Sequence, residues 1–255
     1  MDISGKIAIV SGGASGLGAA CVRLLVEKGA RAAILDLNEG LADALVSEYK
    51  DRVIFIKTDV SDDLNVKSAV QQTKDIFGAV HFAISCAGIG FPEKVLDKDG
   101  PMPMDKFEKT MRVNLSGTLN VIRHASSKMV ENSSNPDGEK GVIINTSSIA
   151  AYEGQIGQVG YTASKAAIIG ITLPIAREFA DYGIRVVTIA PGIFDTPILG
   201  RLSEKIKASL ARQIPFPKRL GDSKEFALLA CHIIENPMIN GETIRLDGSL
   251  RMADR

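Results

Sequence analysis

Short apolar runs rich in β-branched residues alternate along the chain with longer segments of helical periodicity. Runs of this kind, bounded by glycine and polar residues, are typical of strands that are buried on both faces. Their alternation with helices indicates βαβ units and a mostly parallel sheet covered by helices on both sides, an α/β fold of the doubly wound type. The seven predicted strands are Ile7–Val10, Ala32–Leu35, Val53–Ile56, Val80–Ser85, Val142–Asn145, Val186–Ile189 and Glu242–Leu246.

Nothing in the pattern divides the chain into separate domains. Its 255 residues suffice for one large α/β domain, and no internal repeat interrupts the alternation. Two stretches rich in glycine, proline and polar residues, Phe91–Pro103 and Glu131–Gly141, are predicted to be loop insertions. We therefore expect a single domain over residues 1–255.

The stretch Gly192–Leu220 follows a predicted strand and mixes prolines and glycines with apolar residues. Ligands of open α/β sheets bind beyond the carboxyl ends of the strands. We therefore predict a flexible lid over a substrate, formed by a loop and a short helix. Arg201, Lys205 and Lys207 in this lid are candidates for holding an anionic group, although basic residues on such a helix are more often simply solvated.

Composition narrows the function classes. Lys plus Arg equals Asp plus Glu at 30 each, so no basic excess favours binding to nucleic acid. Cys21, Cys86 and Cys231 are far apart in the sequence and form no CxxC pair, which predicts neither a disulfide framework nor a metal site. No cationic leader precedes the first strand, and the apolar runs are shorter than the roughly 20 residues of a spanning helix. We expect a soluble protein in a reducing compartment.

A glycine-rich turn follows the first predicted strand and contains Gly12, Gly16 and Gly18. Glycines at such a turn let the backbone approach a pyrophosphate, whose charge is stabilised by the N-terminus of the next helix. The Gly-x-x-x-Gly-x-Gly spacing is not the commoner dinucleotide pattern and is weak evidence alone. The order strand, glycines, helix, strand makes it stronger and predicts a Rossmann fold with a nucleotide site at this turn.

Asp36 ends the second predicted strand, eighteen residues after Gly18. A carboxylate at this place accepts hydrogen bonds from the adenosine ribose hydroxyls and repels a 2′-phosphate. No arginine or lysine follows in Leu37–Glu39 to compensate. NAD is therefore predicted rather than NADP; the alternative is a solvated aspartate in a turn.

Two further strand ends can line the same groove. Asp59, after the third strand, can accept a hydrogen bond from the adenine amino group, or it can instead cap the helix that starts near Asp62. Cys86-Ala87-Gly88, after the fourth strand, consists of small residues that permit a close approach of the coenzyme. Cys86 is interpreted as a packing residue rather than a nucleophile, because no histidine is near it in the sequence.

Tyr161 and Lys165 are four residues apart, so on a helix they share a face. A free tyrosine has a pKa of about 10, and a cation within about 4 to 6 Å lowers it by about 1 to 3 units. We expect Lys165 to lower the pKa of Tyr161 and the pair to act as a proton shuttle. Ser148, thirteen residues before Tyr161, can hydrogen-bond the reacting oxygen. Ser147 competes for that role, but neighbours on a strand point to opposite faces, and the spacing favours Ser148.

Together these motifs resemble the short-chain dehydrogenase/reductase family over essentially the whole chain. The resemblance implies that Tyr161 is the catalytic acid/base, that Lys165 binds the nicotinamide ribose, and that Ser148 orients the substrate. It also implies that Asn114, otherwise an ordinary polar helix residue, supports a water-linked proton path to Lys165. The motifs, in the order of the family, are Gly12-x-x-x-Gly16-x-Gly18, Cys86-Ala87-Gly88 in place of Asn-Ala-Gly, Asn114, Ser148, Tyr161-x-x-x-Lys165 and Pro191-Gly192.

Longer stretches resemble the members of the family that oxidise 3-hydroxyacyl-CoA thioesters to 3-oxoacyl-CoA with NAD. They are Gly141–Thr146, Glu153–Gln158, Thr172–Arg177, Pro215–Pro217, Arg219–Asp222, Ile234–Pro237 and Ile244–Gly248. The resemblance implies an acyl-CoA or other hydrophobic alcohol or ketone as substrate, and a homotetramer. It implies NAD contacts from Gly12, Ser15, Gly16, Leu17, Gly18, Asp36, Asp59, Val60, Cys86, Ala87, Gly88, Tyr161, Lys165, Pro191, Gly192, Phe194 and Thr196.

One departure and several alternatives qualify this hypothesis. Asp195 stands where a small uncharged residue is more usual; we expect it to face solvent rather than to repel an acidic substrate at the pocket mouth. A hydroxysteroid or other secondary-alcohol dehydrogenase is an alternative, and so is a non-enzymatic scaffold role in RNA processing, against which the intact Ser148, Tyr161 and Lys165 argue. Reduction on an acyl-carrier protein would favour NADP and conflicts with Asp36. We expect a cytoplasmic protein, or a mitochondrial one if the source is eukaryotic.

Overall fold

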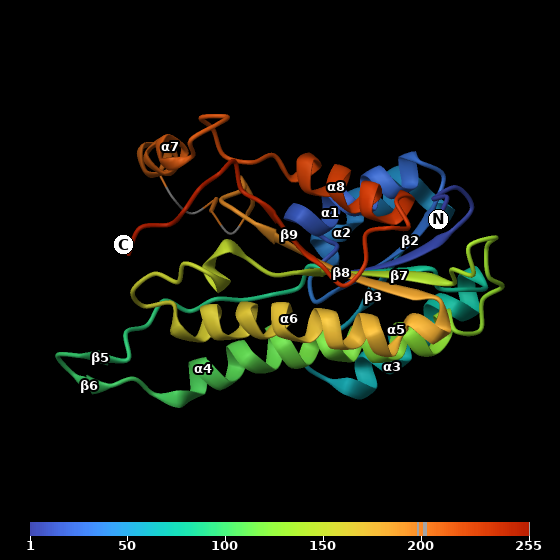
Figure 1. Ribbon diagram of the computed structural model, residues 1–255, viewed down its shortest axis with the longest axis horizontal. Helices are drawn as coiled ribbons and strands as arrows, with labels where there is room; N and C mark the ends of the chain where they lie inside the picture. Colours follow the sequence, from blue (N-terminus) through green and yellow to red (C-terminus); the bar gives the residue numbers. More distant parts are fainter. Residues whose placement is uncertain (198, 201–202, 255) are drawn as a thin grey trace.

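The computed structural model describes residues 1–197, 199–200 and 203–254, and its centre is a seven-stranded parallel sheet (Figure 1). The strand order is β3-β2-β1-β4-β7-β8-β9. The predicted α/β fold and all seven predicted strands are confirmed. The strands are β1 Ile7–Ser11, β2 Arg31–Asp36, β3 Val53–Lys57, β4 Phe82–Ser85, β7 Gly141–Thr146, β8 Ile184–Pro191 and β9 Thr243–Leu246.

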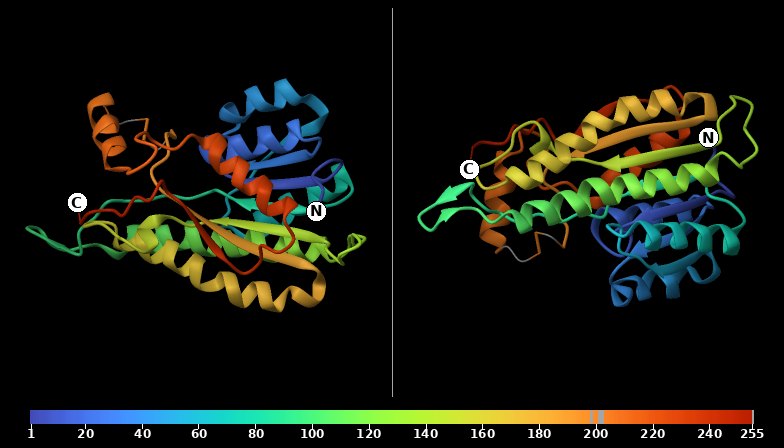
Figure 2. Two further views of the ribbon diagram at one scale, coloured as in Figure 1. Left: turned by 45° about the horizontal axis from the view of Figure 1, so that its top comes forward. Right: turned by 90° about the horizontal axis from the view of Figure 1, so that it is seen from below.

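Helices cover both faces of this sheet in two layers (Figure 2). One layer holds α1 Gly16–Glu27, α2 Glu39–Tyr49 and α8 Ser223–Glu235, and the opposite layer holds α3 Asp63–Phe77, α4 Met104–Met111, α5 Gly117–Met129 and α6 Val159–Glu178. Along β1, Ala8 and Val10 pack with the first layer and Ile9 with the second. Strands whose two faces are both buried must be apolar throughout, which explains the continuous apolar runs in the sequence.

The order of the strands creates a crevice between β1 and β4. From β1 the chain moves outward to β2 and β3, then returns to β4 on the other side of β1 and continues to β7, β8 and β9. Helices therefore leave the two neighbouring strands toward opposite faces. This arrangement is a topological switch point, the place where open α/β sheets bind ligands beyond their carboxyl ends.

The irregular segments follow the predictions in part. The first insertion is not all loop, because it contains a small antiparallel hairpin of β5 Leu96–Asp97 and β6 Gly100–Pro101. Within the segment predicted to be a lid, the described residues include the short helix α7 Glu204–Gln213, and its role as a lid stays a prediction. Among the described residues, α6 is long and apolar enough to cross a membrane by length and composition. In this fold α6 instead lies along the sheet and contacts α4 and β8.

A buried arginine ties the sheet to α8. Arg185, the second residue of β8, is 7% exposed, and its Nε donates to Glu139 Oε1 over 2.6 Å. Its two terminal nitrogens donate to main-chain carbonyls at the end of α8 and just beyond, those of Ile233, Ile234 and Ile239. Since every contact is charge-assisted and shielded from water, the guanidinium acts as a clamp on this corner of the fold.

Replacing this arginine should strongly destabilise the protein. Arg185→Met removes the guanidinium from the buried Glu139 carboxylate, which keeps its pair with the Met1 ammonium, and leaves the carbonyls of Ile233 and Ile239 without this donor. We expect urea denaturation to show a loss of about 3 to 5 kcal/mol in unfolding free energy. The matched control is Arg23→Met, which removes an exposed pair with Glu48 and should cost less than about 1 kcal/mol. Equal losses in the two variants would contradict this account of the clamp.

Candidate active site

The glycine-rich turn is folded tightly against the end of β4. Gly12 and Gly16 have positive φ angles of 65° and 52°, which favour glycine, and Ser15 is the N-cap of α1. A Cβ at Gly12 would lie 2.6 Å from the main-chain nitrogen of Ala87, and one at Gly18 would lie 2.2 Å from the carbonyl oxygen of Gly12. The turn thus forms a backbone cradle at a helix N-terminus, which fits the pyrophosphate of a dinucleotide.

Asp36 lies beside this cradle, at the end of β2. Its Oδ2 accepts a hydrogen bond from the Ala14 amide at 3.1 Å, and its Oδ1 accepts one from the Asn38 amide at 3.1 Å. The carboxylate is therefore fixed in place, half-buried and next to the turn. Leu17 packs behind the turn at the edge of the core.

The residues after β3 are only partly as predicted. The N-cap of α3 is Asp62, whose side chain accepts from the Asn65 amide, so the cap alternative for Asp59 is wrong. Asp59 instead accepts from the amide and hydroxyl of Ser61, at 2.9 and 2.7 Å. Val60 is buried against Gly117, where a Cβ would approach it to 2.7 Å. This close fit packs Val60 against the first residue of α5.

Lys165 is held beneath the carboxyl edge of the sheet. It is 5% exposed, and its Nζ donates to the Thr146 carbonyl over 2.8 Å at the end of β7. Burial lowers the pKa of Lys165 to about 8, because a charged group loses its hydration there. Its Nζ lies 5.7 Å from the centre of the Tyr161 ring. The predicted pair therefore does share a face of α6.

The predicted effect of Lys165 on Tyr161 is not found. The pKa of Tyr161 is raised by burial, and only the hydrogen bond with Ser148 acts to lower it. Sequence spacing placed the cation correctly but gave no measure of how deeply the phenol is buried. Ser147 is turned away, since its Oγ donates to the Lys165 carbonyl at 2.7 Å. Ser148, not Ser147, faces Tyr161.

Asn114 occupies a π-helical turn, Arg112–Ser116, between α4 and α5. It is fully buried, and its Oδ1 accepts from the Ile89 amide while its Nδ2 donates to the Ile89 carbonyl and to Ser164 Oγ, at 2.8, 2.8 and 3.0 Å. π-Bulges of this kind are frequent at functional sites. Asn114 thereby fixes the segment after β4 against α6. Sequence reasoning missed Thr146 and Ser164, whose polar roles depend on tertiary contacts.

The remaining strand ends close around these groups. A Cβ at Gly88 would meet Asn114 Oδ1 at 3.3 Å and Lys165 Nζ at 3.6 Å, so only glycine leaves this space open. Beyond β8, which ends at Pro191, Gly192 packs on the backbone of Asp247, and the buried ring of Phe194 lies against Gly221. Thr196 lies next to Gly16, which brings the start of the lid onto the glycine-rich turn. The predicted site residues thus gather at one edge of the sheet.

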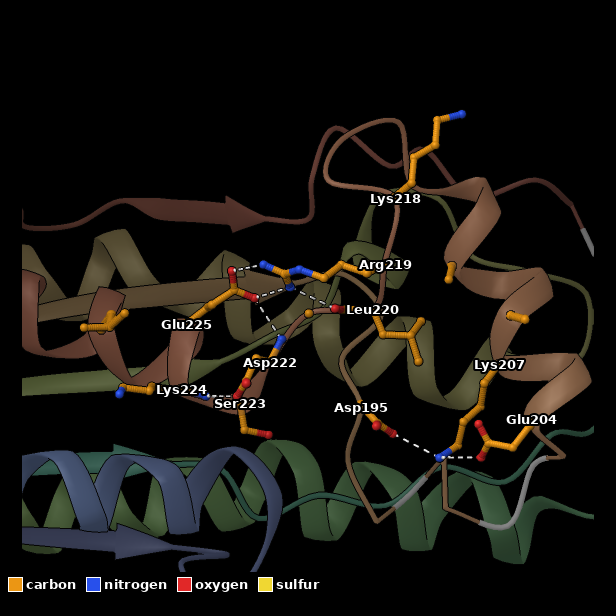
Figure 3. A pocket seen from close by; sticks show the side chains of 14 residues that line it. Asp195, Glu204, Lys207, Lys218, Arg219, Leu220, Asp222, Ser223, Lys224 and Glu225 are labelled. Atoms are coloured by element: carbon orange, nitrogen blue, oxygen red, sulfur yellow. Dashed lines mark hydrogen bonds and ion pairs between the residues drawn. The ribbon is translucent and has the colours of Figure 1, made fainter.

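A pocket of about 810 Å³ lies between α7 and the start of α8 (Figure 3). Asp195 is exposed, as predicted, and pairs with Lys207 at 3.2 Å; Glu204 pairs with the same lysine at 3.5 Å. Lys207 is therefore paired with carboxylates, so it is neither free for an anion nor simply solvated, the two possibilities considered from the sequence. Arg201 lies outside the described residues, and Lys205 is exposed. Arg219 is likewise paired, with both carboxylate oxygens of Glu225.

This fold and this arrangement of residues define a class of protein. The sequence pattern of the short chain dehydrogenases matches residues 6–207, and the chain belongs to that family of NAD(P)-binding oxidoreductases. It is 48% identical over 253 residues to human 3-hydroxyacyl-CoA dehydrogenase type-2, covering 98% of this chain and 97% of the relative. The Drosophila melanogaster protein of the same name is 45% identical over 252 residues, with 98% and 99% covered. The crystal structure of 3-hydroxyacyl-CoA dehydrogenase type-2 from Mycobacterium avium superimposes with a TM-score of 0.94 at 42% identity, with 98% of each chain covered.

A methyl group in the cradle tests its close packing. Gly18→Ala should lower the unfolding free energy by about 1 to 3 kcal/mol and weaken NAD(P)H binding, because the new Cβ displaces the Gly12 carbonyl. Nucleotide fluorescence titration and thermal melting would measure both effects. Gly40→Ala on α2 is the control, since its Cβ would meet nothing nearer than Asn38 Oδ1 at 3.7 Å. The cradle would be misassigned if Gly18→Ala bound the nucleotide as tightly as Gly40→Ala.

Proposed function

We propose that the protein catalyses the reversible, NAD-dependent oxidation of a 3-hydroxyacyl-CoA to the 3-oxoacyl-CoA. The observation that carries this proposal is the meeting of Ser148, Tyr161 and Lys165 beside the glycine cradle at the carboxyl edge of the sheet. The names of the similar human, fly and mycobacterial proteins support the substrate class.

In this proposal the Tyr161 hydroxyl exchanges a proton with the substrate oxygen. Ser148 hydrogen-bonds with the same phenol, so a substrate oxygen that replaces one of these contacts can be held by both hydroxyls. A phenol with a raised pKa is a proton donor near neutral pH and suits reduction of the ketone. Oxidation of the alcohol requires the phenolate, and the hydrogen bond with Ser148 is the contact that acts to lower the pKa of Tyr161 toward it.

Lys165 and Asn114 have supporting roles in the proposal. The ammonium of Lys165 is directed by the Thr146 carbonyl toward the groove, where its remaining protons can bind the ribose of the nicotinamide nucleotide. The side-chain amide of Asn114 is hydrogen-bonded to Ile89 and Ser164. In the proposal Asn114 therefore holds the segment after β4 in place beside the groove. The family's water-linked path from Asn114 to Lys165 stays a prediction.

NAD is the proposed coenzyme, and its nicotinamide ring would accept the hydride released by the alcohol carbon. Asp36 supports NAD over NADP because its carboxylate is fixed at the end of β2, beside the turn that would hold the pyrophosphate. A 2′-phosphate would bring a second anion next to it. The residues proposed to contact NAD are those predicted above, from Gly12 to Thr196.

The pocket beside α7 is the proposed place for the anionic carrier of the thioester. Of its lysines, Lys218 and Lys224 have no ion-pair partner within the described part of the chain. A second, apolar cavity of about 240 Å³ is lined by Phe194, Ile214 and Leu246 among others, and favours a hydrophobic chain. A steroid or other secondary alcohol would also suit an apolar cavity, so parallel assays with acetoacetyl-CoA and steroid alcohols distinguish the two.

The homotetramer and the compartment stay predictions. The outer side of the α5 and α6 layer exposes apolar residues, including Leu119 and Leu173, which are 38% and 44% exposed. Two copies pairing across a two-fold axis would cover this surface, consistent with the proposed homotetramer. A cytoplasmic location is proposed, or a mitochondrial one in a eukaryote.

Removing one hydroxyl tests the acid/base role. Tyr161→Phe should lower kcat for NADH-dependent reduction of acetoacetyl-CoA by about 10²- to 10⁴-fold, with the Kd for NADH nearly unchanged. The control is Tyr182→Phe, an exposed tyrosine that should leave kcat as it is. Turnover of the Tyr161 variant within a few-fold of wild type would refute the proposal. A scaffold function would survive the substitution, so it separates the two hypotheses.

Neutralising the carboxylate at the end of β2 tests the choice of coenzyme. Asp36→Asn keeps an acceptor for the Ala14 or Asn38 amide but removes the charge that repels a 2′-phosphate. We expect the ratio of kcat/KM values for NADPH and NADH to rise by about tenfold or more. Asp43→Asn, on the exposed side of α2, is the control and should leave the ratio unchanged. An unchanged ratio in Asp36→Asn would show that other residues select the coenzyme.

A further inference from the structure

Residues 149–158 form the link between Ser148 and α6, the helix of Tyr161. The link contains one short helical turn, Ile149–Ala151, and then an irregular stretch up to the start of α6. The two hydroxyls of the proposed reaction stand at its ends, so their relative position depends on the contacts that hold the link. On one side, the Glu93 amide donates to the Gly157 carbonyl over 2.7 Å. On the other side, the C-terminal segment of the chain runs beside the link (Figures 1 and 2).

Arg245 of β9 holds this link by a fork of charge-assisted hydrogen bonds. Its Nη1 donates to Glu153 Oε1 over 2.7 Å, and its Nη2 donates to Glu153 Oε2 over 2.9 Å. Its Nε donates to Asp247 Oδ2 over 2.7 Å, and its guanidinium carbon lies 4.9 Å from the centre of the Tyr152 ring. A planar guanidinium can bind two carboxylates and an aromatic face at once, whereas the compact charge of a lysine cannot.

Asp247, the other partner of Arg245, is fixed at the carboxyl edge of the sheet. Its side chain is 8% exposed, and its Oδ1 accepts a hydrogen bond from the Ser249 amide at 2.9 Å. A Cβ at Gly192 would lie 2.9 Å from Asp247 Cα, so this backbone packs directly on the residue beyond β8. Arg245 therefore ties the link to the ends of β8 and β9, which the sheet holds in register.

A small apolar cluster supports the link beside Ser148. Leu250 is 2% exposed and packs with Ile149, the residue after Ser148, and with Ile214, the residue after α7. This cluster is separate from the two main cores on the faces of the sheet. Arg245 Nη2 also donates to the Leu250 carbonyl over 3.0 Å. The same arginine thus fixes the backbone that carries this apolar contact.

The residues after Leu250 hold the far part of the link. The Gln155 side-chain amide donates to the Ala253 carbonyl over 3.2 Å, and the Ile156 amide donates to the Asp254 carbonyl over 3.0 Å. Contacts from β9 and from the segment that follows it therefore reach the link near its beginning, at its middle and near its end.

We propose that Arg245 and Glu153 are positioning residues, which hold the link so that the Ser148 and Tyr161 hydroxyls reach one substrate oxygen. This role rests on the proposed function. The Ser148 hydroxyl already depends on the link, because its Oγ accepts a hydrogen bond from the Ala150 amide at 3.1 Å. Reacting groups that are displaced by about 1 Å can lose about 10²-fold in rate. Loss of the fork should therefore slow turnover without removing any residue proposed to contact NAD.

Two variants of the fork, measured in the whole protein, test this role. Glu153→Gln keeps the shape of the side chain but removes its charge, and Arg245→Gln removes the fork. In both, hydrogen exchange followed by mass spectrometry should show faster exchange in residues 149–158 and unchanged exchange in α1. The kcat for NADH-dependent reduction of acetoacetyl-CoA should fall by about 10- to 10²-fold, with the Kd for NADH and its binding stoichiometry nearly unchanged. The matched control is Arg23→Gln, which removes the exposed pair with Glu48 and should leave exchange in the link and kcat as in wild type.

Two further variants separate the geometry of the fork from its charge. The double variant Glu153→Gln/Arg245→Gln should be no slower than Arg245→Gln, because both changes remove the same contact. Arg245→Lys keeps the charge without the fork, so its kcat should stay about tenfold or more below that of wild type. Losses that multiply in the double variant, or wild-type turnover in Arg245→Lys, would overturn the proposal.

The exchange measurement separates a failure of the positioning role from a failure of the proposed function. Unchanged exchange in residues 149–158, or faster exchange with the kcat of wild type, would overturn the positioning role and leave the proposed function standing. A fall in NADH stoichiometry equal to the fall in kcat would show a loss of folded protein and would overturn it too. If wild type does not reduce acetoacetyl-CoA, the proposed function fails, and exchange in the link decides by itself whether Arg245 holds it. If Arg245→Gln does not fold, Glu153→Gln decides.

Discussion

The burial of one ammonium group is the constraint on which the active-site edge depends. Lys165 is 5% exposed, and a charge so far from water is costly unless it is hydrogen-bonded. The Thr146 carbonyl provides that bond at the end of β7, and the hydroxyl of Ser147 fixes the main chain of the lysine from the same strand end. The position of Lys165 therefore requires that β7 and α6 keep their relative placement. The charge is thereby held beside the Tyr161 ring, at the edge of the sheet where the coenzyme is proposed to bind.

The parallel sheet brings the segments of the site together, and few residues are needed for this beyond those of the strands. Because all seven strands point the same way, their carboxyl ends deliver the glycine cradle, the β4 segment, the serine pair and the start of the lid to one edge. The π-helical turn at Asn114 then joins two of these segments by side-chain hydrogen bonds. A single long helix, α6, adds Tyr161, Ser164 and Lys165. Catalytic geometry here follows from strand order and from a few buried polar contacts.

Most of the fold could be predicted from the sequence because strands buried on both faces have a continuous apolar pattern. The site was predictable where local spacing determines geometry, as for Tyr161 and Lys165. The site was not predictable where the properties of a side chain depend on its burial or on partners that are distant in the sequence. The raised pKa of Tyr161 and the pairing of Lys207 with Asp195 both depend on residues brought together only by the tertiary structure. For the same reason, sequence alone could not show that Asn114 links the segment after β4 to α6 by hydrogen bonds.

The most direct test of the buried ammonium is an NMR titration of the Lys165 side chain, with ¹⁵N at Nζ, in the coenzyme-free protein. Burial predicts a midpoint at a pH of about 8, so that the group is charged at neutral pH and loses its proton well before an ordinary lysine does. A lysine in water would titrate near 10.4. A midpoint at that higher value would show that Lys165 is hydrated and not held beneath the sheet edge, and it would contradict the proposed organisation of the site.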